Sequence, residues 1–97
     1  MSNQMHLTRA IDQIGRVVLP IELRKKMGVT EGKSLFASAA DGAIVLHHEN
    51  GKGVECAINQ LGLVSLPKEL REAAGIHTES NVNVYYTDDT ILLKAAN

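Results

Sequence analysis

The sequence predicts a mostly β protein with short helices, built from two tandem units that each run strand, strand, helix, strand, strand. When the chain is shifted by 47 positions, residues 8–29 align without a gap on residues 55–76, and the similarity weakens but stays in register afterwards. Both units also alternate short β-branched runs with glycine and proline turn signals. We interpret the chain as a tandem duplication, with a first repeat at 1–48, a linker at 49–53 and a second repeat at 54–97.

The first unit begins with two short strands and a short helix. Residues 8–11 predict a strand, Gly15 a turn, and the β-branched residues of 17–19 a second strand. Pro20 follows, and a proline suits the start of a helix because it lacks the N–H donor that would stay unpaired there. Gly28 is placed to end that helix in the left-handed conformation. Asp12 and its counterpart in the second repeat, Asn59, are expected to cap backbone groups of the turns.

A hairpin completes each unit. Residues 34–39 and 43–48 are two strand candidates that flank Asp41-Gly42, a pair typical of a type I′ turn. The second repeat follows the same plan, with Asp88-Asp89 at its turn. A unit of about 40 residues is too small to bury an adequate core without a metal, a disulfide or a partner. The two units must therefore pair with each other or with those of a second chain, and the sequence leaves both layouts open.

Composition and charge exclude several classes of protein. No stretch approaches the roughly 20 apolar residues of a membrane span, and the N-terminus lacks a signal peptide's apolar core. The chain carries a net charge of −1, but residues 1–48 sum to +2 and residues 49–97 to −3. The chain has only three aromatic residues, which is too few for a surface that binds single-stranded nucleic acid by stacking on its bases. We expect a cytoplasmic protein.

Candidate catalytic and metal-binding groups are lacking in the sequence. His47 and His48 are neighbours on a predicted strand and point to opposite faces, so a shared metal site is not expected. Cys56 cannot form an intrachain disulfide and is expected to be a small apolar residue. No phosphate loop, paired acids or Ser-His-Asp arrangement occurs. The sequence therefore predicts a protein that is not an enzyme and has no cofactor.

A long motif carries a resemblance to a known family. Residues 9–29 read R-x-I-D-x-x-G-R-V-V-L-P-x-E-L-R-K-x-x-G-V, and residues 41–46 read D-G-x-I-V-L. This string resembles the AbrB, SpoVT and MazE superfamily of swapped-hairpin DNA-binding domains, and G-L-V-S-L-P-K-E-L-R at 62–71 looks like a diverged copy. The resemblance implies an interlaced barrel of two ββαββ units that binds double-stranded DNA through one basic face. Carried over by position, with Lys26 added as a neighbour on the helix, the DNA-binding candidates are Arg9, Arg16, Arg24, Lys25 and Lys26.

The residues themselves support the same set. Arg9 and Arg16 flank the first turn, and residues 24–26 cluster three basic side chains on a short helix, where they can neutralise phosphates. An arginine can also read guanine through O6 and N7. The competing interpretation is a solvated helix face, with Arg16 in a surface ion pair with Asp12.

The second repeat departs from the motif at the basic positions. At the positions of Arg9, Arg16, Lys25 and Lys26 it carries Cys56, Leu63, Glu72 and Ala73. Arg71 remains, and it is expected to form a surface ion pair with Glu69 or Glu72 and to matter little for DNA. We interpret the second repeat as the structural or dimerising partner.

The first functional hypothesis is a transcriptional regulator on the nucleoid, acting as a homodimer in which two chains bring two basic faces to pseudo-palindromic DNA. The competing layout folds both repeats of one chain into one barrel. A second hypothesis is an antitoxin or protein-interaction module with a toxin partner. Antitoxins of this family add an extended C-terminal segment, whereas residues 93–97 close the second repeat at once. A purely structural oligomerisation unit is the third.

Overall fold

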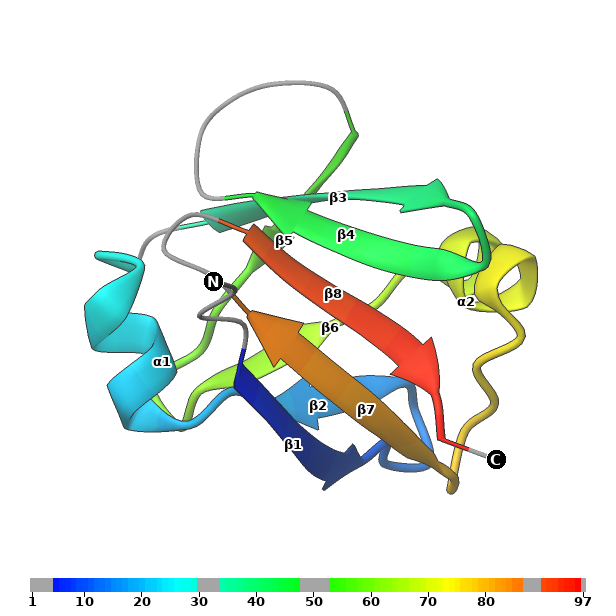
Figure 1. Ribbon diagram of the computed structural model, residues 1–97, viewed down its shortest axis with the longest axis horizontal. Helices are drawn as coiled ribbons and strands as arrows, with labels where there is room; N and C mark the ends of the chain where they lie inside the picture. Colours follow the sequence, from blue (N-terminus) through cyan, green and yellow to red (C-terminus); the bar gives the residue numbers. More distant parts are fainter. Residues whose placement is uncertain (1–4, 30–33, 48–52, 87–89, 97) are drawn as a thin grey trace.

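The computed structural model describes residues 5–29, 34–47, 53–86 and 90–96, and shows eight strands and two helices in this part of the chain (Figure 1). The elements of the first half are β1 (Met5–Ala10), β2 (Arg16–Val18), α1 (Ile21–Lys26), β3 (Ser34–Ala40) and β4 (Ala43–His47). Those of the second half are β5 (Val54–Ala57), β6 (Leu63–Ser65), α2 (Lys68–Ala74), β7 (Asn81–Tyr86) and β8 (Thr90–Ala95). The mostly β fold with two ββαββ halves is as predicted.

The strands of the two halves interleave. A six-stranded antiparallel sheet has the order β1-β7-β8-β4-β3-β5, and β2 pairs with β6 in a separate two-stranded ribbon. The β3–β4 hairpin therefore lies between β5 and β8, both from the second half, and β7–β8 lies between β1 and β4. Bridges between Ile11 and Val17 and between Ile58 and Val64 join the ends of the large sheet to the ribbon. The result is one closed, interlaced barrel, with α1 and α2 at its two sides (Figure 1).

A single chain thus forms the whole barrel. Of the two layouts that the sequence left open, the structure has the one in which both halves of one chain pair with each other, and not the two-chain layout that the count of basic residues favoured. Every strand of the first half pairs directly with a strand of the second half: β1 with β7, β2 with β6, β3 with β5 and β4 with β8. A homodimer of such barrels stays a prediction.

The core is shared by both halves and repeats the 47-residue spacing. Val17, Leu35 and Leu46 from the first half are 0% exposed, as are their counterparts in the second half. Those counterparts are Val64, Val82 and Leu93. Because the buried side chains come from both halves, neither half has a core of its own.

Turns and helix ends explain why the elements stop where they do. Asp41 and Gly42 have φ of 53° and 76°, as a type I′ turn requires, whereas Asp88-Asp89 lies outside the described residues. Pro20 and Pro67 are the N-caps of α1 and α2, one position earlier than expected. None of the helices in the described residues is long and apolar enough to span a membrane.

Candidate nucleic-acid interface

The β2–β6 ribbon turns one face to the core and the other to solvent. Val17 and Val64 lie opposite each other and are completely buried. Because side chains alternate along a strand, their neighbours point outward. This outer surface, called the ribbon face below, consists of Arg16, Val18, Leu63 and Ser65.

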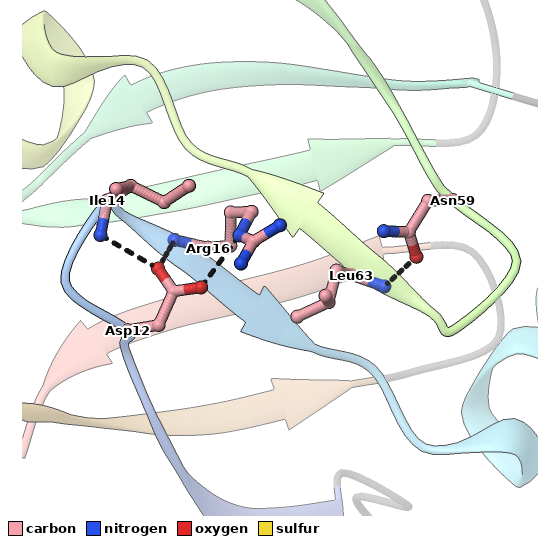
Figure 2. A network of polar contacts seen from close by, with 5 residues as sticks. All are labelled: Asp12, Ile14, Arg16, Asn59 and Leu63. Carbon is pink, nitrogen blue, oxygen red and sulfur yellow. Dashed lines mark hydrogen bonds and ion pairs between the residues drawn. The ribbon is translucent and has the colours of Figure 1, made fainter.

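A tight turn precedes each strand of the ribbon. Asp12 Oδ1 accepts hydrogen bonds from the N–H groups of Ile14 (3.0 Å) and Arg16 (2.8 Å). Asn59 Oδ1 accepts bonds from the N–H groups two and four residues later, both at 2.9 Å. Figure 2 shows the two turns at opposite ends of the ribbon. The prediction that Asp12 and Asn59 cap turn backbone groups is confirmed.

An ion pair distinguishes the first turn from the second. Arg16 Nε lies 2.7 Å from Asp12 Oδ2, with the two side chains 36% and 32% exposed (Figure 2). The pKa of Asp12 is lowered, chiefly because the backbone N–H of Arg16 donates to the carboxylate, with further contributions from the Arg16 side chain and the Ile14 N–H. The surface ion pair weighed for Arg16 therefore forms, and a pair this exposed adds little stability.

Helix α1 presents its basic residues at the surface. Leu23 is its buried residue, and Lys25 and Lys26 are exposed in the last turn. Cations there also interact favourably with the negative end of the helix dipole. These two lysines are the most accessible members of the predicted set.

Arg24, the third basic residue of α1, is fixed against the other half of the chain. Its Nε donates to the carbonyl oxygen of Leu19 at 2.9 Å. Its guanidinium lies over Gly62, where a Cβ would come within 2.9 Å of Nε and Cζ. The N–H of Leu19 also donates to the Gly62 carbonyl at 2.9 Å. Arg24 therefore ties the first helix to the second turn.

Arg71 repeats this arrangement, and the prediction of a surface ion pair for it is wrong. Its Nε donates to the carbonyl oxygen of Leu66 at 3.0 Å, and a Cβ on Gly15 would lie 2.7 Å from its Nε and Cζ. It forms no ion pair with any described residue, including Glu69 and Glu72. The reason is that residues next to each other on a helix do not face each other, and the flat glycine surface of the opposite turn accepts the guanidinium.

The sequence carries a signal for this contact in both halves. Gly15 and Gly62 both have positive φ (87° and 85°), and each meets the arginine that the other repeat retains. Few charged residues occur at equivalent positions of the two halves, and Arg24 and Arg71 are one such pair. Gly15 and Gly62 are also at equivalent positions. A glycine and an arginine at equivalent positions of both halves indicate a contact between the halves.

The remaining predicted residue lies on β1. Arg9 is opposite Val82 of β7 in register, and its Nη1 donates to the carbonyl of Thr8 at 2.8 Å. The structure thus distributes the five candidates over β1, β2 and α1, and the bridge between Ile11 and Val17 brings the end of β1 beside β2.

Other chemistry finds little support in the described part of the chain. Cys56 is buried, and burial together with the charge of Glu55 raises the pKa of its thiol, which disfavours the reactive thiolate. Among the described residues, no group of three or more His, Cys, Asp or Glu side chains could hold a metal ion. His48 lies outside the described residues.

Comparisons with known proteins agree with this architecture. No family model matches the chain. The transition state regulatory protein AbrB of Bacillus subtilis (strain 168) is 42% identical over 40 residues. The solution structure of PHS018 from Pyrococcus horikoshii aligns with 93% of this chain and 88% of that one, with a TM-score of 0.53 and 21% identity. The chain is AbrB-like.

The two similarities differ in extent. The match to AbrB spans 41% of this chain and 42% of the length of the Bacillus protein. The likeness to PHS018 extends over nearly the whole AbrB-like barrel and concerns the fold alone. Together they agree with the swapped-hairpin architecture expected from the motif.

Proposed function

We propose that this AbrB-like protein is a transcriptional regulator that binds double-stranded DNA, has no enzymatic activity, and acts in the cytoplasm on the nucleoid. Its proposed DNA contacts are Arg9, Arg16, Arg24, Lys25 and Lys26. The similarity to AbrB, a regulatory protein, supports this proposal. The observation that carries it is the uneven charge of two otherwise matching halves. Lys25 and Lys26 are exposed on α1, whereas the equivalent positions on α2 carry an exposed glutamate and an alanine.

A salt series tests the proposal. The double variant Lys25→Gln, Lys26→Gln is expected to bind a fragment of the gene's own upstream region more weakly. The slope of log K against log salt should fall by about 0.9 for each lost phosphate contact. Lys94→Gln, which removes one charge from β8, is the control and should leave the slope unchanged. An unchanged slope in the double variant, or equal binding to unrelated DNA in the wild type, would count against a sequence-selective regulator.

A second prediction concerns the carboxylate beside Arg16. Asp12→Asn should strengthen DNA binding and steepen the salt dependence, because it removes a negative charge that competes with phosphate for Arg16. The turn should survive, since Asn59 holds the equivalent turn through its amide oxygen. Isothermal titration with DNA measures the affinity. Asp12→Asn should lower the melting temperature at neutral pH only slightly, because it loses the charge and keeps the turn acceptor. Asp12→Ala, which loses the turn acceptor as well, should lower it more.

The same variant has a signature in the pH dependence of stability. The pKa of Asp12 is lower in the folded protein than in the unfolded chain, so the carboxylate stabilises the fold above about pH 4. This contribution is lost as the pH falls through the lowered pKa of the folded state. Melting curves between pH 2 and 7 should show a smaller acid-dependent loss for Asp12→Asn, and identical curves would contradict the assignment.

A protein-interaction module, such as an antitoxin with a toxin partner, is the second candidate. The observation in its favour is exposed apolar surface at the two turns, where Ile14 is 60% and Leu61 70% exposed. The same surface supports our further proposal that two barrels associate as a homodimer. Light scattering of the wild type and of Ile14→Ser, Leu61→Ser measures this association. If the wild type and the double variant are both monomeric, the homodimer is contradicted. If the wild type also fails to bind DNA, the interaction module is favoured.

A further inference from the structure

Arg71 lies in the second half of the chain but is placed against the turn of the first half. Its guanidinium covers Gly15, with 2.7 Å between a Cβ built there and Cζ, and 3.0 Å to Nη2. Gly15 is the neighbour of Arg16 in the chain, and its carbonyl accepts a hydrogen bond from the Leu66 N–H at 3.0 Å. Arg71 is therefore held at the end of the ribbon face that carries Arg16.

The hydrogen bonding of Arg71 leaves part of its guanidinium available. Nε is used by the Leu66 carbonyl, while Nη1 and Nη2 donate to none of the described residues. The residue is half-buried, and the Nε bond together with the contact with Gly15 fixes the guanidinium in position. A guanidinium fixed through Nε is suited to a phosphate, because the two remaining donors match the phosphate oxygens and little side-chain freedom is lost on binding.

The same geometry occurs at the other end of the ribbon. Arg24 is bound through Nε at 2.9 Å and stacked on Gly62, where the Cβ would lie 3.0 Å from Nη2. Two guanidiniums in equivalent settings thus flank the ribbon, one from each half. The second half keeps this arrangement although its basic helix residues are replaced by Glu72 and Ala73.

We infer that Arg71 is a further contact to the phosphate backbone of double-stranded DNA, contributed by the second half to the surface that the first half carries. This inference rests on the proposed function. DNA would then lie across the ribbon. Arg24 and Arg71 would hold phosphates at its two ends, and Arg16 would lie next to the end that Arg71 covers. The second half accordingly takes part in binding as well as in folding.

Two substitutions separate contact from support. Arg71→Gln and Arg71→Lys both lose the stacked guanidinium and the Nε bond, so both should lower the melting temperature by a similar amount. Arg71→Gln also loses the charge, and its slope of log K against log salt should fall by about 0.9 relative to the wild type. Arg71→Lys should restore most of that slope. Lys68→Gln removes the same charge from α2 without touching the turn, and is the control.

The outcomes are distinct. If Arg71→Gln has the wild-type slope of log K against log salt while the double variant Lys25→Gln, Lys26→Gln has a smaller one, this inference is wrong. The proposed function is then unaffected. No loss of slope in any of these variants overturns the proposed function itself.

A measurement on the wild type covers the case in which Arg71→Gln does not fold. Arginine side chains can be modified with p-hydroxyphenylglyoxal with and without DNA, and the modified sites quantified by peptide mass spectrometry. DNA should protect Arg71 to an extent similar to Arg24. Protection of Arg24 without protection of Arg71 would overturn the inference.

Discussion

Replacing Leu93 with alanine is expected to lower the free energy of unfolding by about 2–5 kcal/mol. Leu93 of β8 pairs with Ile44 of β4 and with Val84 of β7, and its side chain is completely buried. This position is the seam at which the hairpins of the two halves meet, so a cavity there removes contacts from both. Domains of this size are stable by about 5–15 kcal/mol in total, which makes the loss a large fraction.

Denaturant unfolding followed by circular dichroism measures this loss. Leu92→Ala is the matched control, because Leu92 is the adjacent residue on the same strand and is half-exposed on the other face. It should cost about 1 kcal/mol or less. Equal losses for the two variants would contradict the placement of Leu93 in the core. DNA binding of Leu93→Ala should persist at temperatures where the barrel is still folded.

Gly53→Ala is expected to destabilise the barrel by about 2–5 kcal/mol. Gly53 has a φ of 129°, which L-residues rarely adopt, and a Cβ there would lie 2.3 Å from the carbonyl oxygen of Ala37. That oxygen belongs to the backbone of β3 and cannot turn aside as a side chain would. Because Ala37 pairs with Val54 at the start of β5, the substitution should push β5 away from β3.

Thermal melting and amide hydrogen exchange test this prediction. Gly42→Ala is the control, because Gly42 also has positive φ (76°) but nothing lies within 4 Å of its built Cβ. It should cost only the strain of the left-handed conformation, about 1–2 kcal/mol. Faster exchange of the β5 amides in Gly53→Ala, and not in Gly42→Ala, identifies the displaced strand. Indistinguishable melting temperatures would refute the clash.

Local features of the chain were predictable because short sequence patterns determine them. The Asp41-Gly42 turn, the proline at each helix start and the capping role of Asp12 follow from backbone stereochemistry and nearby hydrogen bonds. The partner of each strand was not predictable in this way. A strand pattern states which face is buried but not which strand lies beside it, so the pairing of β1 with β7 needed the structure.

The candidate site shows the same division. Exposure of Lys25 and Lys26 follows from their position on a helix with one buried residue, Leu23. The contact of Arg71 with Gly15 does not follow from the local sequence, because Gly15 lies in the other half of the chain. The nearby glutamates suggest an ion pair for Arg71 instead. Which of the basic residues contact DNA stays a prediction for the experiments above.

The pairing of β1 with β7 also sets an order of events during synthesis. Thr8 is opposite Asn83 in the finished sheet, so β1 gains its neighbour there only after all the residues between them have been made. At the usual rate of about 5–20 residues per second, about 2–8 s separate the end of β4 from the end of β7 on the ribosome. During this interval the first half has its apolar strand faces uncovered. We therefore expect the newly made chain to be most prone to aggregation before the β7–β8 hairpin is complete.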